Sequence, residues 1–110
     1  MSEGEFLEAD ASNVLERGVP VLAMFTAEWC GSCEVFEPVF HDVAACLGES
    51  VRAVTVDTDR LPELAVRFHI TSVPTTLLIR KENTTIVCRG PLSRKRLLAE
   101  LHRQGIGING

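Results

Sequence analysis

The chain has 110 residues, of which 45% are hydrophobic and 24% are charged, and its formal net charge is −4 at pH 7. This length and composition predict one α/β domain over residues 1–110 and leave no room for a second one. The acidic balance gives no support to nucleic-acid binding, which usually leaves a basic patch, and no apolar stretch approaches the roughly 20 residues of a membrane span. We therefore expect no nucleic-acid partner and no membrane contact.

The first elements in chain order lie before residue 27. Phe6–Glu8 fits a short edge strand, and Asp10 or Ser12 can cap a first helix that runs through Arg17. The apolar run 19–26 is typical of a strand buried on both faces. The first twenty residues hold neither a basic n-region nor an apolar h-region, so we expect no signal peptide and a cytoplasmic location.

A pair of cysteines follows this strand in the run Trp29-Cys30-Gly31-Ser32-Cys33. Such a pair can be a cycling disulfide, half of a zinc site or a chance pairing of buried thiols. Apolar residues at helical spacing predict a helix from Cys33 to Leu47. Cys30 then lies where a helix begins, and the unpaired N–H groups there stabilise a thiolate. This context favours thiol–disulfide exchange, with Cys30 as the nucleophile and Cys33 as the resolving thiol.

The remaining pattern predicts strands that alternate with helices. The expected elements are a strand at 51–57, a helix at 61–68, an antiparallel hairpin formed by 75–79 and 85–88, and a helix at 93–104 capped by Ser93. The ends, 1–4 and the glycine-rich 105–110, are expected to fray. The predicted architecture is a mixed central sheet flanked by helices on both faces.

From about Phe6 to about Gln104 the chain resembles the thioredoxin family. Five segments carry the resemblance in the right order: 27–33 with Pro38 five residues beyond Cys33, 56–59, 62–65, 70–75 and 89–93. The resemblance implies the thioredoxin fold and a thiol–disulfide oxidoreductase that reduces or exchanges protein disulfides. The redox-active disulfide would be Cys30–Cys33, with no other cofactor.

The resemblance also implies a substrate surface around the cysteines. A cis Val73–Pro74 bond would turn the backbone of Val73 toward the motif, where its N–H and C=O could pair with an extended substrate segment. Trp29, Gly31 and Ser32 would line the same surface. The simpler alternatives are a trans Pro74 that only begins a strand, and a Trp29 that is an ordinary core aromatic.

Thr26 stands where the family usually has a tryptophan, and three further departures from the family pattern bear on the chemistry. Ser32 replaces the usual proline between the glycine and the second cysteine, and its hydroxyl and N–H can stabilise the Cys30 thiolate, which makes the couple more oxidising. Met24 stands where the family carries a buried aspartate, and Thr55 where it carries that aspartate's lysine partner. A thioether cannot accept the proton of Cys33, so mixed disulfides are expected to last longer than in the usual reductases.

The other cysteines and histidines have simpler interpretations. Core packing accounts for Cys46 and Cys88, and a regulatory or dimer-forming thiol is the alternative. A four-cysteine zinc site would need all four sulfurs to converge, and the chain has no second close pair, so we expect no metal. His69 is expected to end a helix in a left-handed conformation.

Two functional hypotheses follow. The first is an oxidoreductase acting on protein disulfides, with a thioredoxin reductase or a dedicated protein as its redox partner. The second is a thioredoxin-fold adaptor with vestigial redox activity. Both cysteines and the Val73-Pro74 pair are retained, which favours the enzyme. Glu28, Glu34 and Glu37 lie near the motif and would oppose acidic partners. We expect a monomer.

Overall fold

The computed structural model describes residues 19–48 and 50–107. Within these ranges the elements are β1 (Val21–Thr26), α2 (Gly31–Ala44), β2 (Arg52–Asp57), α3 (Pro62–Arg67), β3 (Thr75–Ile79), β4 (Thr84–Arg89) and α4 (Arg94–Arg103). The edge strand expected at 6–8, the helix expected at 10–17 and the end at 1–4 lie outside the described residues.

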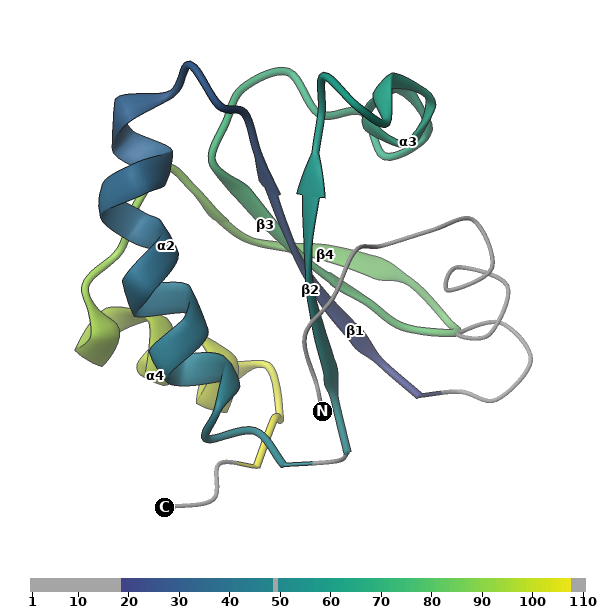
Figure 1. Cartoon of the computed structure of the whole chain (residues 1–110). Coiled ribbons are helices and arrows are strands. Elements are labelled where there is room, and N and C mark those ends of the chain that lie inside the picture. Colours follow the sequence, from purple (N-terminus) through teal and green to yellow (C-terminus); the bar gives the residue numbers. More distant parts are fainter. Residues whose placement is uncertain (1–18, 49, 108–110) are drawn as a thin grey trace.

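The four described strands form one mixed sheet in the order β2-β1-β3-β4. β1 pairs in parallel with β2, and β3 pairs antiparallel with both β1 and β4. The hairpin of β3 and β4 was expected, as was the helical crossover between β1 and β2. Helices α2 and α4 lie on one side of this sheet and α3 lies on the other (Figure 1). The predicted mixed sheet with helices on both faces is confirmed.

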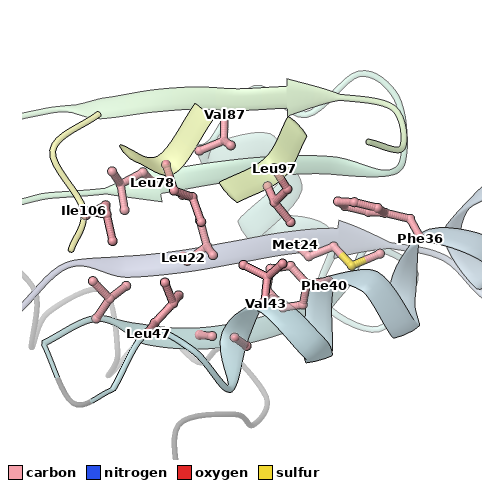
Figure 2. Packing of buried hydrophobic residues seen from close by; sticks show 14 of the residues in the cluster. Leu22, Met24, Phe36, Phe40, Val43, Leu47, Leu78, Val87, Leu97 and Ile106 are labelled. Carbon is pink, nitrogen blue, oxygen red and sulfur yellow. The ribbon is translucent and has the colours of Figure 1, made fainter. Parts of the chain in front are cut away.

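β1 is the centre of the core because both of its faces are buried. Leu22 and Met24 belong to the cluster beneath α2 and α4, whereas Phe25 belongs to the cluster that includes Leu64 of α3. Figure 2 shows the first cluster, in which the side chain of Met24 extends toward α2. Both motif cysteines belong to this cluster as well. The motif is therefore built directly on packed core side chains.

Two helix ends follow the sequence closely. The Ser93 hydroxyl accepts a hydrogen bond from the Arg96 N–H at 3.2 Å and caps α4, as predicted. At the end of α3, His69 has φ 57°, and its N–H donates to the Val66 carbonyl at 3.1 Å. The next N–H, that of Ile70, reaches back to the Ala65 carbonyl at 2.8 Å. This pair of bonds is a Schellman motif, so the left-handed cap predicted at His69 is confirmed.

Most boundaries lie within two residues of the prediction, and two regions differ from it more clearly. α2 begins at Gly31 and ends at Ala44, although Leu47 in the following turn is still fully buried and so extends the apolar pattern past the helix. The end expected to fray from residue 105 is ordered at its start. Ile106 is only 6% exposed, and its N–H donates to the Leu101 carbonyl at 3.0 Å. Burial of Ile106 against the core overrides the flexibility of the neighbouring glycines.

Candidate active site

Cys30 and Cys33 lie at the start of α2, with their sulfurs at disulfide-bonding distance and their Cα atoms 5.3 Å apart. Cys30 is the N-cap residue of the helix, and Cys33 lies in its first turn. The exposed fraction is 6% for Cys30 and 1% for Cys33. The cysteine that caps the helix is therefore the one nearer to solvent, as the sequence predicts for a nucleophile.

Three polar groups surround the sulfur of Cys30. The backbone N–H of Cys33 donates to it at 3.2 Å, the hydroxyl oxygen of Ser32 lies 3.4 Å away, and the carbonyl oxygen of Val73 lies 3.7 Å away. The first two can stabilise negative charge on this sulfur. Both the Ser32 hydroxyl and unpaired N–H groups at the helix start were predicted from the sequence. The structure identifies the N–H of Cys33 as the one that bonds, because an N-cap side chain ordinarily bonds to the amide three residues on.

The loop before β3 faces this sulfur through the Val73–Pro74 peptide bond, which is cis. Two hydrogen bonds hold the loop in place. The Thr75 hydroxyl donates to the Ser72 carbonyl at 2.7 Å, and the Gly90 N–H donates to the Pro74 carbonyl at 2.7 Å. Gly90 has φ 92°, a conformation that glycine adopts without strain. The turn after β4 thus fixes the loop that faces the cysteines.

Trp29 lies on the surface beside the motif. Its exposed fraction is 73%, so it is not a core aromatic. With Thr58, Ala65 and residues 70–73 it lines a small cavity of about 140 Å³ next to the loop that faces Cys30. Gly31 is exposed, and a Cβ built on it would meet no atom within 4 Å. The structure thus brings together the five residues predicted to contact substrate: Trp29, Gly31, Ser32, Val73 and Pro74.

A larger cavity of about 500 Å³ lies on the Cys33 side of the motif. Its walls combine Cys33 with hydroxyl, acidic and basic side chains, and its lining residues are Thr26, Ala27, Glu28, Cys33, Glu34, Glu37, Thr55, Asp57 and Arg60. Met24 is fully buried, and Thr55 stands opposite it in the pairing of β1 with β2. Neither side chain can carry a proton from Cys33 as a carboxylate would. No pattern along the chain predicts this cavity.

The two remaining cysteines differ from each other. Cys88 packs against the core cluster, as predicted, and burial raises the pKa of its thiol. Cys46 is half-buried and does not belong to either core cluster, so the prediction of core packing is wrong there. Its sulfur lies 3.6 Å from the Asp42 carbonyl oxygen and 3.7 Å from a guanidinium nitrogen of Arg94. The cause is the early end of α2, which leaves Cys46 in the turn beyond the helix.

Within residues 19–48 and 50–107, no three side chains of His, Cys, Asp or Glu converge closely enough to hold a metal ion. Among the helices of the same ranges, none is both long and apolar enough to cross a membrane.

Known proteins resemble this chain in sequence. The thioredoxin family model matches residues 7–103. A thioredoxin-like protein of Synechocystis is 32% identical over 74% of this chain and 78% of its own length, and the thioredoxin of Mycobacterium tuberculosis is 33% identical over 83% and 78%. Thioredoxin 1 of Synechococcus elongatus is 39% identical over 61% of this chain and 63% of its own length.

The fold has solved counterparts. The crystal structure of chloroplastic thioredoxin z has a TM-score of 0.78 and covers 97% of both chains at 21% sequence identity, a likeness that concerns the fold alone. The family match instead extends to the sequence and includes the run that contains both cysteines. The chain therefore belongs to the thioredoxin family and is a thiol–disulfide oxidoreductase, with Cys30 and Cys33 as its dithiol.

Proposed function

We propose that Cys30 attacks the disulfide of a protein substrate and that Cys33 resolves the resulting mixed disulfide. The observation that carries these roles is the position of Cys30, whose sulfur caps α2 and accepts the N–H of Cys33 at 3.2 Å. A thiolate is stabilised at such a helix N-terminus. An adaptor without redox chemistry is not favoured, because both cysteines are retained at bonding distance.

The reaction proceeds in two exchanges. The Cys30 thiolate bonds to one substrate sulfur, the substrate S–S bond breaks, and the departing sulfur takes the electron pair and then a proton. Cys33 next loses its proton and attacks the sulfur of Cys30. The bond between Cys30 and the substrate breaks, so the substrate leaves as a dithiol. The protein is left oxidised and must be reduced before it can act again.

Substrate recognition rests on the surface around Cys30. An extended substrate segment would pair with the backbone of Val73, and Trp29 would cover its apolar side chains. Gly31 leaves open space above the motif, and Pro74 fixes the course of the loop. Contacts of this kind are mainly to the main chain, so they select an extended conformation rather than one sequence.

Electrostatics limits the partners. Glu28, Glu34, Glu37 and Asp57 line the cavity beside Cys33, with Arg60 as the one basic lining residue. This acidic surface favours neutral or basic protein partners over acidic ones. We propose a thioredoxin reductase or a dedicated protein as the electron donor, and a reducing compartment, the cytoplasm, as the place of action. The protein would act as a monomer.

Trapping tests the two roles. Each single serine variant is incubated with a disulfide-bonded model protein such as insulin, and adducts are counted by mass. Cys33→Ser is expected to accumulate a mixed disulfide through Cys30, whereas Cys30→Ser forms none and loses turnover. Adducts on Cys30→Ser instead would reverse the roles. Full turnover by Cys30→Ser would refute the mechanism.

A redox titration in glutathione buffers tests the direction of electron flow. A potential near the thioredoxin value of about −270 mV would indicate a general reductase. The Ser32 hydroxyl lies 3.4 Å from the Cys30 sulfur, where it would stabilise a thiolate more than a disulfide sulfur, so we expect a higher, more oxidising value. Such a value would place the protein among oxidants, isomerases or enzymes with a dedicated partner.

A further inference from the structure

We propose that Glu37 accepts the proton of Cys33 when the mixed disulfide is resolved. This inference rests on the proposed function, because it concerns the second of its two exchanges. The position where the family carries a buried acid holds Met24, so the proton of Cys33 needs another acceptor. The cavity of about 500 Å³ supplies the route, because Cys33 and Glu37 both line it.

The helix places these two side chains on one face. Cys33 and Glu37 are four residues apart within α2, and residues at this spacing are neighbours on a helix surface. Cys33 is only 1% exposed, and we infer that water reaches its sulfur through the cavity that Cys33 lines. A cavity of this size with polar walls admits water, and one water can bridge a thiol and a carboxylate that do not touch.

The other acidic groups of the cavity are less suited to the task. Glu34 directly follows Cys33, and adjacent helix residues do not face each other. Asp57 lies at the end of β2, where one of its carboxylate oxygens accepts the backbone N–H groups of Asp59 and Arg60 at 2.9 and 3.3 Å. Glu28 lies in the loop before α2. Glu37 alone combines the lining of the cavity with the helix face of Cys33.

Beyond Glu37, the same spacing leads to His41. Its Nε2 lies 3.6 Å from the Glu37 carboxylate, and 42% of its side chain is exposed. A proton held by Glu37 therefore has a path along the helix surface toward solvent. The charged and titratable groups near Glu37 and Cys33 are Glu34 and His41 on α2, Glu28 in the preceding loop, and Asp57 and Arg60 at the end of β2.

Resolution of the mixed disulfide moves one proton and exchanges one disulfide bond for another. The proton of the Cys33 thiol moves through water to the Glu37 carboxylate, and the sulfur lone pair of Cys33 forms the bond to the Cys30 sulfur. The bond between Cys30 and the substrate breaks, and the substrate sulfur leaves with the electron pair and is protonated from solvent. Glu37 then returns its proton to solvent. Cys30 and Cys33 are oxidised together, and the substrate disulfide is reduced.

The test separates the two exchanges in time. Reduced protein is mixed with oxidised glutathione in excess, and Trp29 fluorescence together with acid-quenched mass spectra follows the mixed disulfide. The attack by Cys30 gives a phase that depends on glutathione concentration, and the resolution by Cys33 gives one that does not. Glu37→Gln is expected to slow the second phase at pH 7 by about tenfold, less than the ~10²–10⁴-fold of a directly bonded base. The first phase should change little.

A matched control exposes a purely electrostatic role. Glu34→Gln removes the same charge from the same cavity, and by weakening repulsion it should leave the second phase unchanged or faster. If Glu37 acted only through its charge, Glu37→Gln would also be unchanged or faster, which would overturn the proposal. A slow second phase in Asp57→Asn, with a normal one in Glu37→Gln, would overturn it as well.

The pH dependence adds a readout that a structural defect would not move. With Glu37 present, the rate of the second phase should decrease only slightly as the pH is lowered from 8 to 6. In Glu37→Gln this rate should be proportional to the hydroxide concentration. Glu37→Asp should recover part of the wild-type pH dependence. Because 43% of the Glu37 side chain is exposed, these variants are expected to fold. Absence of both phases in the wild-type protein would refute the proposed function itself rather than this step.

Discussion

Thr55 of β2 stands directly opposite Met24 of β1 in the parallel pairing of the two strands. Thioredoxins usually carry a lysine and a buried aspartate at these two positions. Here the strand pair is kept, and both charges are absent. Loss of only one would leave an uncompensated buried charge, so the two replacements are physically coupled.

Restoring the acid alone should therefore destabilise the fold. Met24 is fully buried, and Met24→Asp is expected to lower the free energy of unfolding by about 3–5 kcal/mol, the cost of an unpaired buried charge. Adding Thr55→Lys should recover part of that loss. Urea unfolding measures both effects. Met24→Leu, which keeps the volume and adds no charge, should cost less than about 1.5 kcal/mol and serves as the control. Wild-type stability in Met24→Asp would contradict the expected cost.

Ser32 should make the Cys30–Cys33 couple more oxidising through its hydroxyl, which lies 3.4 Å from the Cys30 sulfur. Ser32→Ala removes this contact, destabilises the dithiol form, and is expected to lower the reduction potential by about 30 mV, equivalent to ~1.4 kcal/mol. Equilibrium with glutathione gives the potential. Ser32→Thr keeps a hydroxyl and should stay close to wild type. An unchanged potential in Ser32→Ala would show that this hydroxyl does not stabilise the Cys30 thiolate.

Cys46 and Cys88 should differ in their reaction with iodoacetamide once the Cys30–Cys33 disulfide is closed. Both cysteines are half-buried, but Cys46 lies outside both core clusters, whereas Cys88 packs against one of them and burial raises the pKa of its thiol. Because the thiolate is the reactive form, we expect Cys46 to react at least about ten times faster at pH 8. Mass spectrometry of Cys46→Ser and Cys88→Ser assigns each modified site. Faster labelling of Cys88 would be inconsistent with its burial.

Burial of the Cys88 thiol should also make the free energy of unfolding depend on pH in the alkaline range. The folded-state pKa of Cys88 lies above that of an unfolded thiol, so the folded state holds this proton more tightly. Its contribution is then complete below the unfolded value of about 8.5 and is lost as the pH rises through the folded value. Unfolding free energies measured between pH 7 and 10 should fall less steeply in Cys88→Ala than in the wild type. Parallel curves would exclude this thiol as the cause.

His69 carries a backbone penalty that glycine would not. Its φ of 57° lies in the left-handed region, which costs a residue with a Cβ roughly 1 kcal/mol. His69→Gly is therefore expected to raise the free energy of unfolding by up to about 1 kcal/mol, and His69→Ala should not raise it. Chemical unfolding of both variants checks the difference. A destabilised His69→Gly would show that the imidazole makes a contact worth more than the backbone penalty.

Local signals made much of the fold predictable. The cap at Ser93, the left-handed residue at His69 and the strand 75–79 depend on neighbours in the sequence, and the structure confirms each. The place of Cys30 at the start of α2 followed from the same logic. Where prediction failed, distant contacts decided the outcome. Ile106 is ordered because it packs on the core, whereas the glycines on either side of it predict a flexible end.

The functional site, like the fold, was predictable from the sequence only in part. The four-residue spacing of Cys33 and Glu37 is visible in the sequence. It suggests a proton acceptor only because the structure places both residues along one cavity. That cavity exists because the end of β2, with Asp57 and Arg60, comes close to the first turns of α2. No pattern along the chain encodes this approach. The departures at Met24 and Thr55 were evident from the family resemblance, whereas the residue that could compensate for them required the three-dimensional arrangement.

The sulfur of Cys30 has two tasks, since it also caps α2 by accepting the N–H of Cys33. As a thiolate it makes a charge-assisted hydrogen bond to that amide, and as part of a disulfide it is a weaker, neutral acceptor. The hydrogen bond that caps the first turn of α2 is therefore stronger when the protein is reduced and weaker when it is oxidised. Reduction should tighten this turn and oxidation should loosen it, so amide hydrogen exchange at Cys33 would serve as a gauge of the redox state.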